Sequence, residues 1–548
     1  MKIQPILDSI NPNQFINDYL SICGVKDVDA YLHSDLSICD SPWDYPNMMI
    51  GVERLKAAID NDEHIGIIQD PDHDGVSSAT VIYRFIKKVN SAQKITVFIH
   101  KGKQHGIVQS KEEDLLQDVI DAGINLLICP DSASNDFKQC HELKAHNIDT
   151  LILDHHEITS NNPDAIVINH HLGENLNINL SGCGVTFKFV QACAESWDID
   201  IGDEFYDLVA SSLATDNCSM TSPENYALTK YGFAHLTNPM LIAMYEKFNR
   251  RGNCPEGVSW GLGPQVNAVV RGGTMEDKEK LFRAFVGEGD IDKAIEIANE
   301  RHKEQGTIST KLAKDIKKEM DCDHKVLVGF STEEYKNYSG LVANHFTGEY
   351  NKPTLILRPL NSTMWSGSLR SPVEIADKIN DTGFAKCQGH LSACGIFLKK
   401  SNLEKLVNWF DQTDLDMEPC KIVAAKIEPK DITVQLCDDC KNNSMIWGQD
   451  IPKPVFYLNL TTNPNEVIVY AKRTKTVKLQ YGNVEVMKFR AKAEDVEMLT
   501  NSKCNIECIV SLETNEWNGK VSPQAVVSEW NITPIEDDDE DESWEDCF

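Results

Sequence analysis

Three short apolar runs in the first half of the chain each end on acidic or imidazole side chains. One run leads into Asp70, a second into Asp131, and a third into Asp154, His155 and His156. Each run is typical of a buried strand in a series of βαβ units. In an open parallel sheet, ligands bind just beyond the carboxyl ends of the strands. The pattern therefore predicts a parallel α/β sheet with one polar site along its carboxyl edge.

The first of these strand ends carries three carboxylates on alternate positions, in Asp70-Pro-Asp72-His-Asp74-Gly. A calcium loop of the EF-hand type would need a glutamate at its twelfth position, where this chain has Val81. The run before Asp70 is also strand-like rather than helical. Carboxylate and imidazole groups suit Mg²⁺ or Mn²⁺, so the segment predicts a site for such ions.

The other acidic and imidazole groups enlarge this set. Asp216 follows a predicted helix, and it joins Asp131, His155 and His156 as a further candidate. Together with the first segment, these residues can hold two ions that share a carboxylate. Two ions roughly 3.5–4 Å apart support in-line displacement at a phosphodiester. The set therefore indicates phosphoryl chemistry.

Composition limits the class of protein. The formal net charge is −31, and the last thirteen residues carry nine acids and no base. This argues against one broad basic face, so a nucleic acid would need a locally basic channel. The absence of a long apolar run and of a leader-like N-terminus predicts a soluble, unexported protein without a membrane partner. The 17 cysteines are then expected to be reduced thiols in a cytoplasm.

Changes of pattern divide the chain into six segments. A helical stripe around 308–320 predicts a long connecting helix, and short alternating strands after about 430 predict a small β-barrel. The expected fold is α/β, with two α/β domains joined by that helix. The predicted segments are an N-terminal piece (1–50), a first α/β domain (51–300), the connecting helix (301–323), a smaller α/β domain (324–420), a small β-barrel (421–535) and a disordered acidic tail (536–548).

The motifs resemble, in order, those of the DHH phosphoesterase superfamily. The four segments around Asp74, Asp131, His155 and Asp216 look like its four motifs, and within it the chain is similar to the RecJ single-strand-specific DNA exonucleases. Further agreeing pieces are Ser181-Gly-Cys-Gly, Gly263-Pro-Gln-Val-Asn267, Ser366-Gly-Ser368-Leu-Arg370, Gln388-Gly389-His390 and Trp447-Gly-Gln-Asp. The resemblance spans about residues 45–535. It implies that segment 51–300 is the catalytic domain, that segment 324–420 is a substrate-binding domain, and that the barrel at 421–535 is an oligonucleotide-binding-like, nucleic-acid-binding domain.

The resemblance implies a role for each matching residue. Asp131 would bridge two divalent cations, Mn²⁺ or Mg²⁺, and His156 would touch the scissile phosphate. Asp154 would orient an imidazole from outside the ligand set. The implied metal ligands are Asp70, Asp72, Asp74, Asp131, His155 and Asp216, with Asp131, His155 and His156 counted as catalytic. The implied substrate-binding residues are Asn267, Arg271, Ser368, Arg370, Gly389 and His390.

Three departures concern recognition of the substrate end. The chain has Gln388 where the family usually has glycine before Gly-His, and Tyr226 where it usually has arginine. The stretch Lys103-Gln-His-Gly lacks the arginine and the Gly-Tyr-Gly of the family. Every metal position is filled, so the departures bear on substrate recognition rather than on metal chemistry.

The function implied is a metal-dependent 5′→3′ exonuclease. It would hydrolyse single-stranded DNA to 5′-mononucleotides, as a monomer, in recombination, repair or replication in a bacterial or phage-infected cell. One alternative is a phosphodiesterase or phosphatase of short oligonucleotides or cyclic dinucleotides. Another is a non-catalytic DNA-binding replication scaffold.

Features of the last third allow more than one interpretation. Trp447, Trp517 and Trp530 are candidates for base stacking but equally for a core. Four cysteines at 437, 440, 504 and 508 have a spacing that permits zinc, although a buried strand face explains the last two. The acidic tail ends at Phe548 like the tip of a bacterial single-strand-binding protein. One hypothesis is that the tail binds the proteins that recognise such tips. The other is that the tail competes with DNA for the basic channel.

Overall fold

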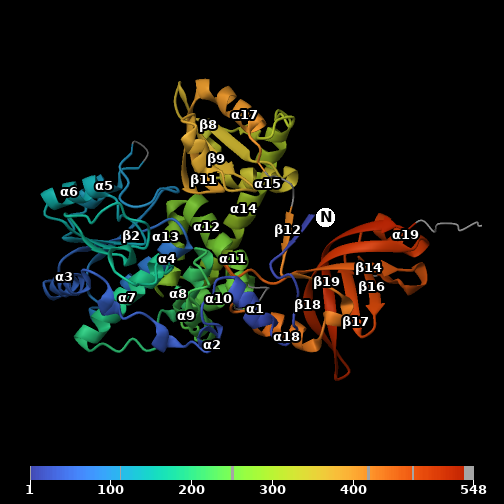
Figure 1. Cartoon of the computed structure of the whole chain (residues 1–548). Coiled ribbons are helices and arrows are strands. Elements are labelled where there is room, and N and C mark those ends of the chain that lie inside the picture. The colour runs from blue at the N-terminus through green and yellow to red at the C-terminus, as the bar shows by residue number, and fades with distance from the viewer. Residues whose placement is uncertain are drawn as a thin grey trace, which may run out of the picture. The chain divides into compact units, whose positions relative to one another are not determined.

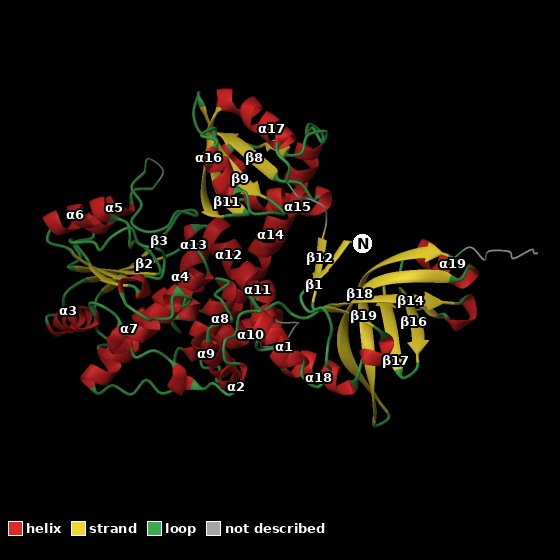
Figure 2. Cartoon of the chain, in the orientation of Figure 1, coloured by secondary structure: helices red, strands yellow, loops and turns green. Residues whose placement is uncertain are grey.

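The computed structural model describes residues 2–110, 113–248, 252, 254–415, 420–471 and 474–535 (Figures 1 and 2). Two compact units form in the chain. The larger unit runs from Ser34 into the segment before Cys420. The smaller unit combines the described residues up to His33 with those from Cys420 onward. The predicted acidic tail lies outside the described residues.

The larger unit opens with a five-stranded parallel sheet of order β3-β2-β4-β5-β6. Its central strands are apolar and buried on both faces, as expected for a parallel sheet covered by helices. This confirms the predicted parallel α/β domain. The strands are β2 (Ile65–Gln69), β3 (Ile95–Ile99), β4 (Leu126–Pro130), β5 (Asp149–Leu153) and β6 (Ile166–Ile168).

Helices cover this sheet on both faces and continue beyond it. Leu116 and Leu143, on two helices of one face, pack against Ile152 of the sheet. On the other face, Gly51 lies so close to Leu151 that a side chain there would clash. The helices are α3 (Met48–Asp60), α4 (His73–Val89), α5 (Leu115–Asp121), α6 (Phe137–Ala145), α7 (Gly182–Trp197), α8 (Tyr206–Thr215), α9 (Pro223–Ala234), α10 (Pro239–Phe248), α11 (Pro255–Gly261), α12 (Gly263–Gly272) and α13 (Met275–Phe285).

The connecting helix is α14 (Ile291–Lys317), which begins before the predicted residue 301. Asp290 sets its start, because its side chain accepts a hydrogen bond of 3.0 Å from the Lys293 N–H. The predicted apolar stripe is present, since Leu312, Ile316 and Met320 pack in one buried cluster.

The second α/β part of the larger unit is a five-stranded sheet of order β10-β11-β9-β8-β7. Only β7 and β8 are parallel, and the other neighbours are antiparallel. Its strands are β7 (Leu327–Phe330), β8 (Thr354–Pro359), β9 (Met364–Arg370), β10 (Ala385–His390) and β11 (Ala393–Lys399). Its helices are α15 (Ser339–Tyr350), α16 (Ala376–Asp381) and α17 (Leu403–Gln412).

The smaller unit is built from both ends of the chain. Its N-terminal helix packs on the C-terminal sheet, with the rings of Phe15 and Phe456 5.4 Å apart and the Tyr19 hydroxyl donating to the Pro452 carbonyl at 3.0 Å. The predicted segment 1–50 is thus divided between the two units. The N-terminal elements are β1 (Lys2–Pro5), which pairs in parallel with β12, α1 (Phe15–Ile22) and α2 (Val28–Leu32).

The rest of the smaller unit is a seven-stranded sheet of order β13-β14-β18-β19-β17-β16-β15, which confirms the predicted sheet-rich C-terminal domain. The elements from Cys420 onward are β12 (Cys420–Val423), β13 (Ala425–Ile427), α18 (Val434–Asn442), β14 (Phe456–Thr462), β15 (Ile468–Ala471), β16 (Lys475–Tyr481), β17 (Val484–Phe489), α19 (Ala493–Asn501), β18 (Cys504–Trp517) and β19 (Lys520–Pro534).

The three candidate stacking tryptophans lie in different environments. Trp447 is a core residue at 2% exposure, and its indole N–H donates to the Cys440 carbonyl at 2.9 Å. Trp530 is half-buried and donates to Asp495. Trp517 is 74% exposed where β18 turns into β19, so it alone of the three presents a free indole face.

The cysteines proposed as an alternative zinc site lie on α18 and β18 and are buried. Within the described ranges, no cysteine belongs to a group of side chains close enough to hold an ion. Over the same ranges, no helix combines the length and apolar character that crossing a membrane requires.

Candidate metal and nucleic-acid site

Asp74 lies in the first turn of α4 and is held by the start of another helix. Its Oδ2 accepts the Gly182 N–H at 2.9 Å, and its Oδ1 accepts the Cys183 N–H at 2.8 Å. The Ser212 hydroxyl also donates to Oδ1. The first N–H groups of a helix attract acidic side chains, so the start of α7 holds this carboxylate in position.

Asp131 occupies the turn after β4 in a left-handed backbone conformation, with φ of +64°. Its N–H donates to the Leu153 carbonyl at 2.8 Å, which joins this turn to the end of β5. A side chain at Gly182 would place its Cβ only 2.2 Å from the Asp131 Oδ1. The glycine at 182 is therefore required for the carboxylate of Asp131 to enter the site.

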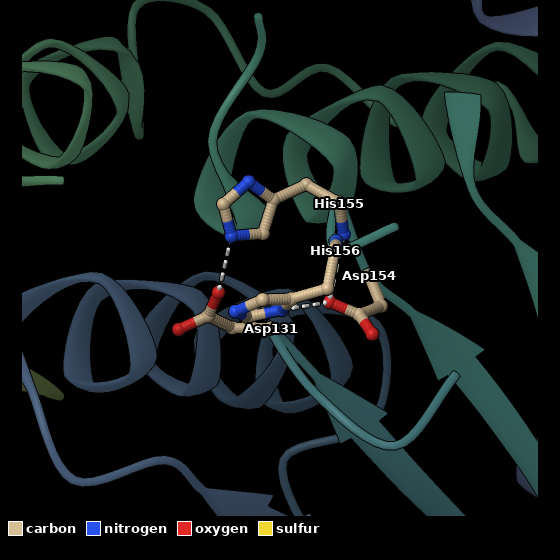
Figure 3. A group of neighbouring side chains, drawn as sticks. All are labelled: Asp131, Asp154, His155 and His156. Carbon is tan, nitrogen blue, oxygen red and sulfur yellow. Dashed lines mark hydrogen bonds and ion pairs between the residues drawn. The ribbon is translucent and has the colours of Figure 1, made fainter. Parts of the chain in front are cut away.

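His155 connects two of the acids. Its Nε2 lies 3.3 Å from the Asp131 Oδ1 and 3.7 Å from the Asp216 Oδ2 (Figure 3 draws the first contact). Asp216 itself is the residue at which α8 ends. Burial raises the pKa of Asp216 to about 7, and the charge of Asp74 adds to this effect.

Asp154 orients the neighbouring imidazole (Figure 3). Its Oδ1 contacts the His156 Nδ1 at 2.8 Å and accepts the His155 N–H at 2.7 Å. Burial acts to raise the pKa of Asp154, but the hydrogen bond from His156 and the charges of His156 and His155 together hold it well below its usual range. With Nδ1 occupied by Asp154, the other nitrogen of His156 is directed away from the carboxylate and can donate to a ligand.

Asp72 has two partners. Its side chain caps α4 by accepting the Gly75 N–H at 3.1 Å, and Arg271 approaches its Oδ2 at 3.3 Å. Burial acts to raise the pKa of Asp72, but the guanidinium of Arg271 holds it below its usual value. Arg271 also donates to the Pro71 carbonyl at 2.9 Å, so it braces the acidic segment from α12.

Asp70 receives groups from the loop after β3, which sequence reasoning did not assign. The His105 Nδ1 contacts the Asp70 Oδ2, and the Gly106 N–H donates to the Asp70 Oδ1 at 3.3 Å. The signal that identified the other strand ends was present here as well, because the apolar run of β3 leads directly into His100. Residues 103–106 stood out only as a departure from the family pattern.

The donor set fits divalent cations. Asp131 is buried among acids, so burial raises its pKa well above the ordinary value and the charges of Asp74, Asp72, Asp70 and Asp216 raise it further. Such repulsion persists unless a cation neutralises it. Over the described residues, three groups have donor atoms within 4.8 Å of one another: Asp74, His155 and Asp216; Asp131, Asp154, His155 and His156; and Asp70, Asp72 and His105.

The predicted substrate residues of the first α/β domain border this cluster. The Asn267 side chain accepts the His73 N–H at 3.1 Å and so caps α4. Burial lowers the pKa of Lys103 to about 8, and Arg271 and Arg370 lower it further. Three cations from separate segments are thus close enough to influence one another.

The predicted substrate residues of the second sheet lie on β9 and β10. The Ser368 hydroxyl lies 2.8 Å from that of Ser339, and Arg370 donates to the Leu369 carbonyl at 2.8 Å. His390 is exposed at the end of β10, after Gly389 with φ of +120°. The structure therefore brings Arg370 toward Arg271 and Lys103, whereas it leaves His390 on the surface.

The acid cluster predicts how the stability of the metal-free protein depends on pH. An unfolded aspartate titrates near pH 4, whereas the pKa of Asp216 in the folded protein is about 7. Between these values the folded state binds more protons, so the free energy of unfolding should fall as the pH rises. Thermal melts in chelator from about pH 4.5 to 7.5 measure this, and saturating Mn²⁺ should flatten the curve. Melts that are flat in chelator would contradict it.

Two family models match the chain. The DHH family, N-terminal domain, matches residues 64–213, and the RecJ OB domain matches residues 423–529. The first covers the parallel sheet, α7 and the acid cluster apart from Asp216, and the second covers most of the seven-stranded sheet.

Similar proteins cover nearly the whole chain. One relative, named "Putative SPbeta prophage-derived single-strand DNA-specific exonuclease YorK" from Bacillus subtilis (strain 168), is 26% identical over 93% of this chain and 94% of its own length. The single-stranded-DNA-specific exonuclease RecJ of the same organism is 23% identical over 92% of this chain and 66% of its own.

The fold is also that of a solved structure. The crystal structure of RecJ in complex with Mn²⁺ from Thermus thermophilus superposes with a TM-score of 0.73 at 17% identity, over 98% of this chain and 79% of that one. The chain therefore contains one region that matches the DHH family, N-terminal domain, and one that matches the RecJ OB domain, and it is similar along most of its length to proteins named single-strand DNA-specific exonucleases.

Proposed function

We propose that the chain is an exonuclease that hydrolyses single-stranded DNA with the help of divalent cations. The observation that carries this proposal is the buried acid cluster, with Arg271 3.3 Å from Asp72 and with Lys103 near enough to Arg271 and Arg370, in the same unit, to be affected by their charges. The acids suit cations, and the basic groups suit the phosphates of a strand. The names of the relatives support single-stranded DNA as the substrate.

Two divalent cations, Mn²⁺ or Mg²⁺, are proposed to bind the cluster, with the Asp131 carboxylate shared between them. When bound, they supply an activated water and neutralise charge that develops on the phosphate. The proposed ligands are Asp70, Asp72, Asp74, Asp131, His155 and Asp216.

His156 is proposed to contact the scissile phosphate. Asp154 holds its Nδ1 at 2.8 Å, so the ring cannot rotate freely and its Nε2 faces away from the carboxylate. Burial acts to lower the pKa of His156, but the hydrogen bond to Asp154 raises it to about 9. The imidazole therefore carries a proton at neutral pH and can donate it as a charged hydrogen bond to a phosphate oxygen.

The basic groups are proposed to guide the strand into the cluster. Arg271 and Arg370 offer planar guanidinium groups, which bind phosphate through two N–H groups at once. The overall charge of −31 repels DNA elsewhere on the surface, so these local cations would determine where a strand can enter. The exposed indole of Trp517 is a candidate for stacking on a base farther along.

The finer features of the activity come from the resemblance. They are 5′→3′ polarity, release of 5′-mononucleotides, and holding of the strand end by Ser368, Gly389 and His390. A monomer acting in recombination, repair or replication in the cytoplasm of a bacterial or phage-infected cell is proposed on the same ground. Proteins that read acidic C-terminal tips are proposed partners of the tail.

The test uses purified protein, Mn²⁺ or Mg²⁺, and one strand of about 50 nucleotides labelled separately at each end. We expect immediate release of a 5′-labelled mononucleotide and a slowly shortening 3′-labelled ladder. The same strand in a blunt duplex should be resistant, and chelator should stop the reaction.

Other outcomes would each point away from this function. A 3′-labelled mononucleotide as first product would reverse the polarity. Intact long DNA with cleavage of a dinucleotide would favour a phosphodiesterase of small substrates. Tight binding without cleavage of either would favour a replication scaffold.

A further inference from the structure

His105 extends the acid cluster from the loop after β3, in which no metal ligand was predicted. Its ring lies with Asp70 and Asp72 in a group whose donor atoms are all within 4.8 Å of one another. This group shares no residue with the other two groups. It contains one imidazole and two carboxylates, the same kinds of donor as the group of Asp74, His155 and Asp216.

The backbone after His105 is shaped to keep the ring in place. Gly106 adopts φ of +71°, and a Cβ there would lie 2.3 Å from the Asp136 Oδ2. That same oxygen accepts the Ile107 N–H at 2.7 Å, while Asp70 accepts the Gly106 N–H at 3.3 Å. The buried carboxylate of Asp70 and the partly buried carboxylate of Asp136 therefore hold the loop immediately after the imidazole.

The start of the loop is fixed as well. The Lys278 ammonium donates to the carbonyls of His100 at 2.7 Å and Lys101 at 3.0 Å. The Glu113 carboxylate accepts the Lys101 N–H at 2.7 Å. A loop held at both ends presents His105 in one position, as a ligand position requires.

A second observation points to a cation at the same place. His100 is fully buried, and neither of its ring nitrogens makes a hydrogen bond to a described residue. Its Nε2 faces the Asp70 Oδ1 at 3.9 Å, and its Nδ1 faces Glu113 at 3.7 Å. Buried imidazoles normally have hydrogen-bond partners. A carboxylate that binds a cation through one oxygen can accept an N–H through the other, which would give His100 its partner.

We infer that His105 supplies a nitrogen ligand to one of the two divalent cations, together with Asp70 and Asp72. This inference rests on the metal-dependent function proposed above. The stretch that holds His105 is one where the chain lacks the Gly-Tyr-Gly of the resembled family. Because imidazole suits transition metals better than it suits Mg²⁺, His105 should favour Mn²⁺ at this position.

The test measures cation binding without DNA. Titration calorimetry with Mn²⁺ and with Mg²⁺ is compared between the wild type, His105→Ala and His141→Ala. His141 is the matched control, because its Nδ1 also contacts an aspartate, Asp164 at 2.9 Å, but on the surface away from the cluster. We expect His105→Ala to weaken one Mn²⁺ site by roughly 10–100-fold, with a smaller change for Mg²⁺ and none in His141→Ala.

Counting the histidine nitrogens bound to Mn²⁺ separates loss of a ligand from a folding defect. Electron spin-echo modulation of bound Mn²⁺ detects coordinated histidine nitrogens, and it should find one fewer in His105→Ala than in the wild type. Equal counts with unchanged Mn²⁺ affinity in a variant of normal melting temperature would overturn the inference. If that variant and the wild type both still cleave DNA, only the role of His105 fails. A wild type that binds no cation and cleaves nothing would instead refute the proposed function.

Discussion

Asp131→Asn is expected to lower the rate of DNA hydrolysis by at least about 10³-fold and to raise the melting temperature of the metal-free protein. The rate falls because the shared carboxylate of the two proposed cation sites is lost. The stability rises because burial, together with the neighbouring acids, raises the pKa of Asp131 well above the ordinary value. Relief of about 1 kcal/mol of such repulsion corresponds to roughly 1–2 °C in a unit as large as the one that holds Asp131. Asparagine suits this position, since it tolerates the φ of +64° found there.

The matched control is Asp207→Asn, which changes another buried acid. Asp207 accepts the N–H groups of Thr237 at 2.8 Å and Asn238 at 2.6 Å, so its carboxylate is paired rather than repelled. This variant should melt at a lower temperature and still be stabilised by Mn²⁺, whereas Mn²⁺ should stabilise Asp131→Asn much less. The account of the cluster is wrong if Asp131→Asn melts below the wild type or retains full activity.

His156→Ala should reduce kcat by ~10²–10³ with little change in KM for the DNA. The reason is that the protonated ring is proposed to donate to the phosphate during the reaction rather than to hold the strand. In the wild type, activity should decline as the pH rises through about 9, because the raised pKa of His156 keeps the ring protonated below that value. Initial rates from neutral pH to beyond this value on a labelled strand measure both effects.

Two variants separate this role from a structural one. Asp154→Asn keeps the ring but loses the carboxylate that raises its pKa, so the decline should move to lower pH. His171→Ala removes a ring that packs on His170, with centroids 4.5 Å apart. Among the described residues, His171 belongs to none of the groups that could hold an ion, so the pH profile of this variant should match the wild type. A change of KM alone in His156→Ala would indicate a binding role instead.

The grouping of the acids was predictable in large part, because Asp70, Asp131 and Asp154 each come directly after an apolar run typical of a buried strand, whereas Asp216 follows a helix. At each of the three strands the apolar run ends directly before the acidic residue. The carboxyl ends of parallel strands lie along the same edge of a sheet, so these acidic residues come together whatever sequence separates the strands. The partners of these acids were not predictable. That the start of α7 holds Asp74, or that Gly182 makes room for Asp131, depends on packing between segments about 50 to 110 residues apart.

Three other features depend on contacts between distant segments, which the local sequence does not reveal. His105 follows the edge strand β3 within a loop of mixed polarity, and its position depends on contacts with Asp70 and Asp136. Trp447 could be assigned to the core only once the indole N–H was seen to reach the Cys440 carbonyl. The helix around Phe15 has its partner more than 400 residues away, so its membership of the C-terminal unit could not be read from periodicity.

That partnership affects how the chain is made. During synthesis from the N-terminus, α1 leaves the ribosome long before Phe456 and the strands beside it exist. The unit from Ser34 to the segment before Cys420 needs no later residue and can fold as it emerges, as domains generally do. Throughout that time the apolar face of α1, with Phe15 and Leu20, has no sheet to pack against. A pause in translation, or a premature stop, would therefore leave a folded nuclease centre with an exposed, aggregation-prone N-terminus.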